Sequence, residues 1–115
     1  MLYDKRWETK APVRLEPWQK LLLDAADLIE KGGLAKHRFA ISKSDGNTSY
    51  CAAGALTAAD HAKEFLSMSV TGKTAFARFN AYIGPTRSIS TWNDKPERTK
   101  EEVVTALRAA VEQEV

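Results

Sequence analysis

A helix start signal near the C-terminus constrains the fold of this chain more than any other feature. Thr99 is followed three residues later by Glu102, which is the spacing of a capping box, where each side chain bonds the other residue's backbone amide. Apolar residues then recur on one side of the predicted helix: Val103, Val104, Leu107, Ala110 and Val111. The sequence therefore predicts a final helix with one face in a core.

A second strong helical pattern lies near the start of the chain. Pro17 suits the first position of a helix, and Gly32-Gly33 is typical of its end. Between them, apolar residues recur at helical spacing: Trp18, Leu21, Leu22, Ala25, Leu28 and Ile29.

Three weaker helical segments are expected between these two. One is capped by Thr48 or Ser49 and runs from Cys51 towards Phe65, with Gly54 tolerated in its interior because another backbone packs closely there. Another runs from Thr74 to Ile83. The last is a short turn that contains Ile89 and Trp92. We expect the aromatic residues of the 74–83 helix to be buried: Phe76, Phe79 and Tyr82.

Residues 37–50 have a different pattern. Polar and apolar residues alternate from Arg38 to Ser42, and Asp45-Gly46 is typical of a tight turn. The fold class is therefore mainly α: a compact bundle of about four to five helices with a short hairpin or extended loop at 37–50. We expect residues 1–15 to be irregular and residues 16–115 to form a single helical domain, since 115 residues suffice for one core.

Composition excludes several kinds of protein. No apolar run is long enough to span a membrane, and the N-terminus lacks the apolar core of a signal peptide, so we expect a cytoplasmic protein. Cys51 is the only cysteine, which rules out an intrachain disulfide. With His37 and His61 as the only histidines, we expect no metal site and no cofactor.

The most suggestive polar cluster is Trp92-Asn93-Asp94. An aromatic ring beside an amide and a carboxylate is typical of contacts with a small ligand or a peptide. The structural alternative is that Trp92 fills the core, while Asn93 and Asp94 hold the connection to the last helix through hydrogen bonds to backbone. Burial of the three side chains decides between the two.

Charge distribution suggests a second possibility. No acidic residue lies between Glu64 and Asp94, whereas Lys73, Arg78 and Arg87 fall within that stretch. Residues 74–92 also resemble a helix-turn-helix with Gly84 at the turn. The alternative function is therefore nucleic-acid binding through these three cations.

Cys51 raises a third possibility, a thiol-dependent enzyme. A thiol at a helix N-terminus is acidified by the backbone amides there, and His37 could serve as its base. His61 lies ten positions further along the predicted helix, about 15 Å away by helical rise, which is too far. The structural alternative is that Cys51 is a small buried residue, since free cysteine is among the most buried residue types.

Several short motifs together resemble a family of small bacterial and phage proteins of unknown function. The residues that carry the resemblance are Ala25–Glu30, Asp45-Gly46, Cys51–Leu56, Ile89, Trp92-Asn93-Asp94, Arg98-Thr99 and Glu102-Val103. The resemblance begins at about Trp18 and implies no known activity. We expect a small non-catalytic protein of phage origin that binds a protein partner in the host, with Trp92, Asn93 and Asp94 as contact residues.

Overall fold

The computed structural model describes residues 15–63, 65–84 and 88–112, so nearly all of the N-terminal segment expected to be irregular lies outside the described residues. The described residues form a mainly α-helical fold, as predicted. Its elements are α2 (Pro17–Gly32), β1 (Ala40–Ser42), β2 (Thr48–Tyr50), α3 (Ala52–Ala59), a 3-10 turn (Phe65–Ser67), α4 (Val70–Ile83), α5 (Ile89–Asn93) and α6 (Lys100–Ala110).

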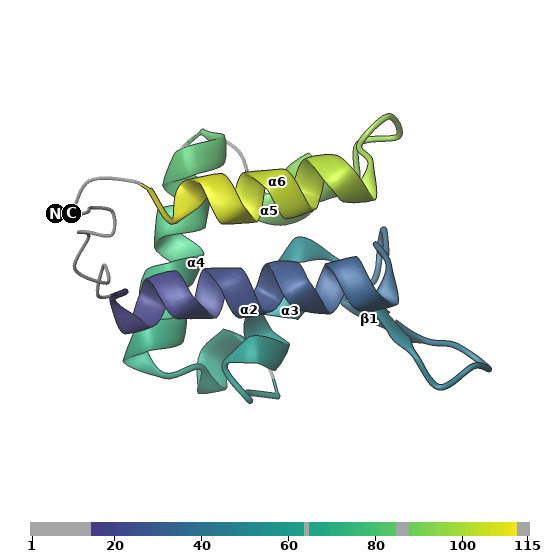
Figure 1. Cartoon of the computed structure of the whole chain (residues 1–115), viewed down its shortest axis with the longest axis horizontal. Coiled ribbons are helices and arrows are strands. Elements are labelled where there is room, and N and C mark those ends of the chain that lie inside the picture. Colours follow the sequence, from purple (N-terminus) through teal and green to yellow (C-terminus); the bar gives the residue numbers. More distant parts are fainter. Residues whose placement is uncertain (1–14, 64, 85–87, 113–115) are drawn as a thin grey trace, which may run out of the picture.

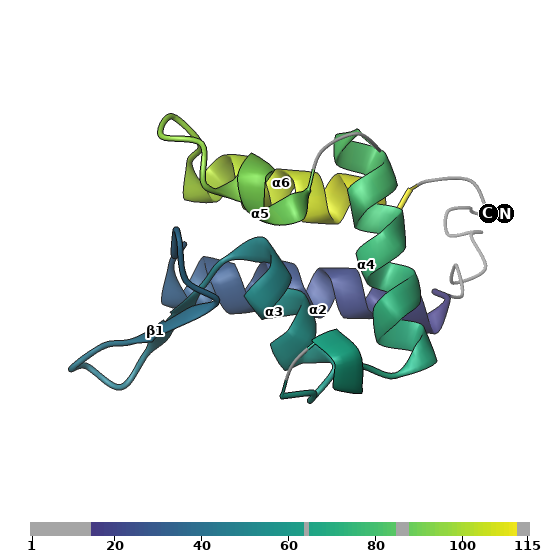
Figure 2. The same cartoon turned by 180° about the vertical axis from the view of Figure 1, so that it is seen from behind.

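The two helices with the strongest patterns, α2 and α6, lie side by side and run in opposite directions (Figure 1). The predicted capping box is present: Thr99 Oγ1 accepts from the Glu102 amide at 3.1 Å, and Glu102 Oε1 accepts from the Thr99 amide at 3.0 Å. Helix α4 crosses both helices near one end, while α3 and α5 cover them nearer the hairpin (Figure 2). The largest fully buried side chains come from these helices: Phe79, Leu22, Ile29, Leu56, Ile89, Leu107, Val103 and Asn93.

The predicted hairpin is confirmed. Strands β1 and β2 pair antiparallel, with Ile41 opposite Ser49, around the Asp45-Gly46 turn. The other side of β2 is bonded to the end of α2: the Tyr50 amide donates to the Gly33 carbonyl, and the Ala35 amide donates to the Tyr50 carbonyl. The hairpin therefore projects from one end of the helical body with its base tied to that body (Figure 1).

Two glycines allow the hairpin to lie against the helices. A Cβ atom on Gly32 would overlap the carbonyl oxygen of Thr48, and one on Gly54 would overlap the carbonyl oxygen of Phe39. Backbone atoms cannot move aside as the end of a long side chain can. The expectation that Gly54 is tolerated because another backbone approaches it is confirmed.

The predicted bounds of α3 are wrong at both ends. The helix begins after Cys51, which is itself the cap, because Ser49 donates its hydroxyl to the Gly32 carbonyl and Thr48 lies within β2. It ends at Ala59 rather than near Phe65. His61 adopts a left-handed conformation with φ 61° and its amide bonds the Ala58 carbonyl, while the Ala62 amide bonds the Thr57 carbonyl. These are the bonds of a Schellman ending, with histidine at the position usually held by glycine.

Helix α4 begins four residues earlier than predicted. Ser69 caps it by accepting from the Gly72 amide at 3.0 Å, and the Asp60 carboxylate fixes Ser69 through both its amide and its hydroxyl. This cap depends on a tertiary partner, so local sequence did not reveal it. Phe79 is fully buried as expected, but Tyr82, the second-last residue of α4, is 45% exposed.

Candidate functional site

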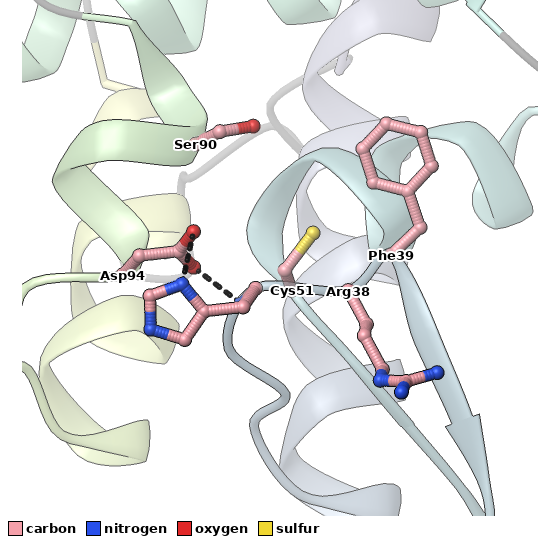
Figure 3. Close-up of a pocket in the computed structure, with 6 residues that line it drawn as sticks. Arg38, Phe39, Cys51, Ser90 and Asp94 are labelled. Carbon is pink, nitrogen blue, oxygen red and sulfur yellow. Dashed lines mark hydrogen bonds and ion pairs between the residues drawn. The ribbon is translucent and has the colours of Figure 1, made fainter.

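A pocket of about 470 Å³ lies where the hairpin meets α3 and α5. We call it the hairpin pocket, and its lining residues are His37, Arg38, Phe39, Cys51, Ser90 and Asp94. Ser90 and Asp94 face Cys51 and Phe39 across the pocket, while the Arg38 side chain points away from its centre (Figure 3). Segments far apart in sequence therefore build one polar and aromatic site.

Asn93 fixes the geometry beneath this pocket. Its side chain is fully buried, and its Oδ1 accepts from the Ala52 amide at 2.9 Å while its Nδ2 donates to the Ala35 carbonyl at 2.9 Å. These bonds join α5 to the start of α3 and to the segment that precedes the hairpin. Asn93 is thus a tertiary fastener: its bonds hold α3 and the segment before the hairpin, whereas the expected bonds were to the connection before the last helix.

Asp94 forms the polar wall of the pocket together with His37. Its Oδ1 accepts from the His37 amide at 2.9 Å and from Asn93 Nδ2 at 3.0 Å, and its Oδ2 lies 3.5 Å from His37 Nδ1. His37 has φ 66°, a left-handed conformation that directs its amide at Asp94. Burial raises the pKa of Asp94, but the hydrogen bonds from His37 and Asn93 and the charges of His37 and Lys36 outweigh it, so this pKa lies below its ordinary value.

This lowered pKa predicts a pH dependence of stability. The stabilisation is complete well above the ordinary pKa of 3.8 and is lost as the pH falls through the lower value of the folded state. Asp94→Asn removes the carboxylate that gains a proton in acid. The free energy of unfolding of this variant should therefore fall less than that of the wild type between pH 5 and about pH 3. Urea denaturation at both pH values measures this difference.

The matched control for Asp94→Asn is Asp24→Asn. The Asp24 carboxylate pairs with Lys20 within α2 at 3.6 Å, and Asp24 does not line the hairpin pocket. We expect Asp24→Asn to lose stability in acid as the wild type does. Equal acid sensitivity of Asp94→Asn and the wild type would contradict the role given to Asp94.

Cys51 is 3% exposed, and its Sγ accepts a hydrogen bond from the Gly54 amide at 3.2 Å. Burial raises the pKa of this thiol and outweighs the Gly54 hydrogen bond, which lowers it; the Asp94 charge raises it further. His37 lines the same pocket, but its Nδ1 faces Asp94. The arrangement favours a neutral thiol that caps α3.

Trp92 is 9% exposed and packs edge-to-face on Phe79 with ring centroids 5.5 Å apart. The Arg98 guanidinium covers its ring at 4.2 Å, and Arg98 Nε donates to the Trp92 carbonyl at 3.0 Å. Such cation–π contacts are themselves stabilising. Trp92 therefore packs into the core on one side, and on the other it lines, with Arg98 and Tyr82, a second pocket of about 420 Å³ beside α6.

Two of the three cations of the nucleic-acid alternative, Lys73 and Arg78, lie among the described residues. Lys73 is exposed on α4, and the Arg78 guanidinium lies 4.8 Å from the centre of the Trp18 ring. Arg87 lies outside the described residues. Helix α5 has five residues, and its Ile89 and Trp92 face the core. Within residues 74–92, helix α5 therefore packs against the core.

Three lining residues of the hairpin pocket were not predicted from the sequence as site residues: Arg38, Phe39 and Ser90. Phe39 is 56% exposed, although its alternation with polar neighbours was noted. A three-residue strand on a projecting hairpin leaves both of its faces in solvent, so apolar residues there need not be core residues. Phe39 directly precedes such a strand, and its place beside the predicted hairpin was the signal available.

The match to known families agrees with the extent of the fold. A model of a family of unknown function, DUF6197, matches residues 14–113. The chain belongs to DUF6197. The DUF6197 match contains every described helix, the hairpin and all residues of the hairpin pocket. The expected membership in a family of unknown function is confirmed. Comparisons with curated proteins and with solved structures gave no match.

Among residues 15–63, 65–84 and 88–112, no helix is long and apolar enough to cross a membrane. In the same ranges, no three side chains of the types His, Cys, Asp and Glu converge as they would around a metal ion.

Proposed function

We propose that this chain is a non-catalytic binding protein and that the hairpin pocket contacts a protein partner. The observation that carries this proposal is the exposure of Arg38 and Phe39 at the pocket, above a backbone held by hydrogen bonds. Among the described residues, neither side chain has a polar or aromatic partner. Arginine and aromatic residues are enriched in the part of an interface that contributes most to affinity.

The rigid base of the hairpin supports the same proposal. The backbone beneath Phe39 is bonded to Cys51, and the His37 amide is bonded to Asp94. A contact residue on a fixed backbone loses less conformational entropy when it binds. The resemblance to phage proteins makes a host protein the proposed partner, and a cytoplasmic location stays a prediction.

A binding role is favoured over thiol catalysis by the state of Cys51. Nucleophilic attack requires a thiolate, whereas burial holds this group as a thiol. Its closest polar contact is a structural one, the Gly54 amide that it caps.

Cys51 should therefore react slowly. In the folded protein, we expect its alkylation by iodoacetamide at neutral pH to be at least tenfold slower than that of a model thiol, and unfolding in urea should remove this protection. Mass spectrometry of timed samples measures both rates.

Ser90→Cys in a Cys51→Ala background is the matched control, because Ser90 is exposed on the opposite wall of the pocket. This new thiol should react at an ordinary rate. Faster alkylation of folded wild type than of the model thiol would instead revive the enzyme alternative.

A selection of peptides tests the proposed function. A displayed library of random 12-residue peptides is selected on the wild-type protein, and each selected peptide is measured against two double variants. Arg38→Glu with Phe39→Ser alters the pocket. The control variant, Lys73→Glu with Tyr82→Ser, likewise replaces a cation by Glu and an aromatic residue by Ser, at exposed positions of α4.

We expect the selected peptides to bind the pocket variant at least tenfold more weakly than the wild type and to bind the α4 variant equally well. Peptides that bind both variants equally, or a selection that yields no binder, would contradict the proposed function.

A further inference from the structure

The outer edge of β1 is open. The Cys51 amide bonds the Phe39 carbonyl just before β1, and the Lys43 amide bonds the Asn47 carbonyl just after it. In this register Ile41 is the residue of β1 whose backbone groups face Ser49 of β2. In an antiparallel pair, the residues on either side of such a residue direct their backbone groups away from the partner strand. Ala40 and Ser42 therefore present amide and carbonyl groups outward, and in the described chain nothing pairs with them.

The opposite edge of the hairpin is not available. Thr48 and Tyr50 are the outward-facing residues of β2. The Tyr50 amide and carbonyl are bonded to Gly33 and Ala35, and the Thr48 carbonyl lies against Gly32. An additional strand can therefore join the described hairpin beside β1, where all three residues are exposed.

The side chains of β1 give this edge two different faces. Successive residues of a strand point to opposite sides. Within β1, Ile41 lies on one face and Ala40 and Ser42 lie on the other. Arg38 and Phe39 directly precede the strand and point in opposite directions (Figure 3). Phe39 is 56% exposed and Ile41 is 39% exposed. A strand that joins here would place alternate side chains against an apolar surface and a polar surface. Its apolar residue beside Phe39 would reach the hairpin pocket.

Charge selects among the possible occupants of this edge. Between Glu30 and Asp45 the chain has no acidic residue and four cations: Lys31, Lys36, Arg38 and Lys43. Arg38 lies directly before β1, whereas Lys36 donates to the Lys95 and Pro96 carbonyls and Lys43 donates to the Gly32 carbonyl, which leaves both ammonium charges without an ion pair to an acid in the described chain. A second copy of the chain would bring the same positive charges and be repelled. Short strands flanked by cations are a usual means of preventing pairing between copies. An acidic strand is complementary to the same charges.

We infer that β1 binds an extended segment of the partner that alternates acidic and apolar residues and adds to the sheet as a strand. This inference rests on the proposed function and specifies its partner. Main-chain bonds to Ala40 and Ser42 supply affinity, and the two faces of β1 supply specificity, as in other cases of strand addition.

The first test uses synthetic seven-residue peptides with blocked ends. One alternates Glu and Val, and its control alternates Lys and Val. Titration followed by NMR should show binding of the acidic peptide at least tenfold tighter than that of the basic one. N-methylation of alternate peptide amides tests the main-chain bonds. In an added strand, every second amide faces β1. Methylation of that set should abolish binding, and methylation of the other set should not.

The second test changes the edge itself. Ser42→Pro removes an outward amide but no bond to β2, and proline is tolerated on edge strands. Ser44→Pro is the matched control, because Ser44 is the second residue of a turn closed by the Gly46 amide and the Lys43 carbonyl, where proline is favoured. We expect Ser42→Pro to weaken binding of the acidic peptide at least tenfold and Ser44→Pro to leave it unchanged.

The outcomes separate the inference from the proposed function. If peptides from the library depend on Arg38 and Phe39 but bind Ser42→Pro normally, strand addition is wrong and the proposed function stands. If no peptide depends on Arg38 and Phe39, both are wrong. If the free protein dimerises and Ser42→Pro dissociates the dimer, the occupant is a second copy, which overturns the inference.

Discussion

Asn93→Ala is expected to lower the free energy of unfolding by about 3 kcal/mol, because a buried backbone group without a partner costs roughly 1–3 kcal/mol. The substitution leaves two such groups, the Ala52 amide and the Ala35 carbonyl, and it also opens a small cavity. A domain of this size is stable by roughly 5–15 kcal/mol, so the loss is large. Urea denaturation followed by circular dichroism measures it.

Asn80→Ala is the matched control for Asn93→Ala. Asn80 is a partly exposed residue of α4, and in the described chain its side chain has no hydrogen bond. The same chemical change there should alter the free energy of unfolding by about 0.5 kcal/mol or less, because surface substitutions away from such networks are small. If the two variants were equally stable, Asn93 would not be the fastener described above.

Gly54→Ala is expected to destabilise the protein by about 2 kcal/mol or more, although alanine is the better helix former. Helix propensity alone predicts a gain of about 1 kcal/mol. The added Cβ atom, however, would overlap the Phe39 carbonyl oxygen, and the hairpin would have to shift to make room. Overpacking of this kind typically costs about 1–3 kcal/mol and occasionally more.

Two measurements identify the cause of this loss. In Gly54→Ala, amide NMR signals of the hairpin should move together with those of α3. Gly46→Ala places a Cβ atom in open space at φ 90°, so it should cost only the conformational strain of about 1–2 kcal/mol and leave the α3 signals in place. A Gly54→Ala protein that is more stable than the wild type would show that the two backbones do not meet.

Local sequence was sufficient for the elements that carry their own signals. Thr99 and Glu102 cap α6 by themselves, and Pro17 with the apolar stripe defines α2, so both helices were predicted correctly. The beginning of α4 could not be predicted in this way. Its cap, Ser69, is held by Asp60, and a contact between residues nine positions apart leaves no periodic pattern in the sequence.

The candidate site was predictable only in part. Trp92, Asn93 and Asp94 were recognised as one cluster, but their three side chains have different surroundings. The Trp92 ring is covered by Arg98, and the Asn93 side chain is bonded to backbone groups. Of the three, only Asp94 lines the hairpin pocket. Such differences between neighbouring side chains depend on which elements pack around the segment. Sequence spacing does not contain that information.

The bonds of Asn93 also determine how the hairpin can open. The tip at Gly46 can fray without disturbing the helices, because its neighbours are exposed. The base cannot, since Asn93 holds the chain both before and after the hairpin. Amide hydrogen exchange should therefore be fast at the tip and as slow at Ala52 as in the helical core. Fraying is thus confined to the tip of the hairpin, and its base belongs to the most persistent part of the protein.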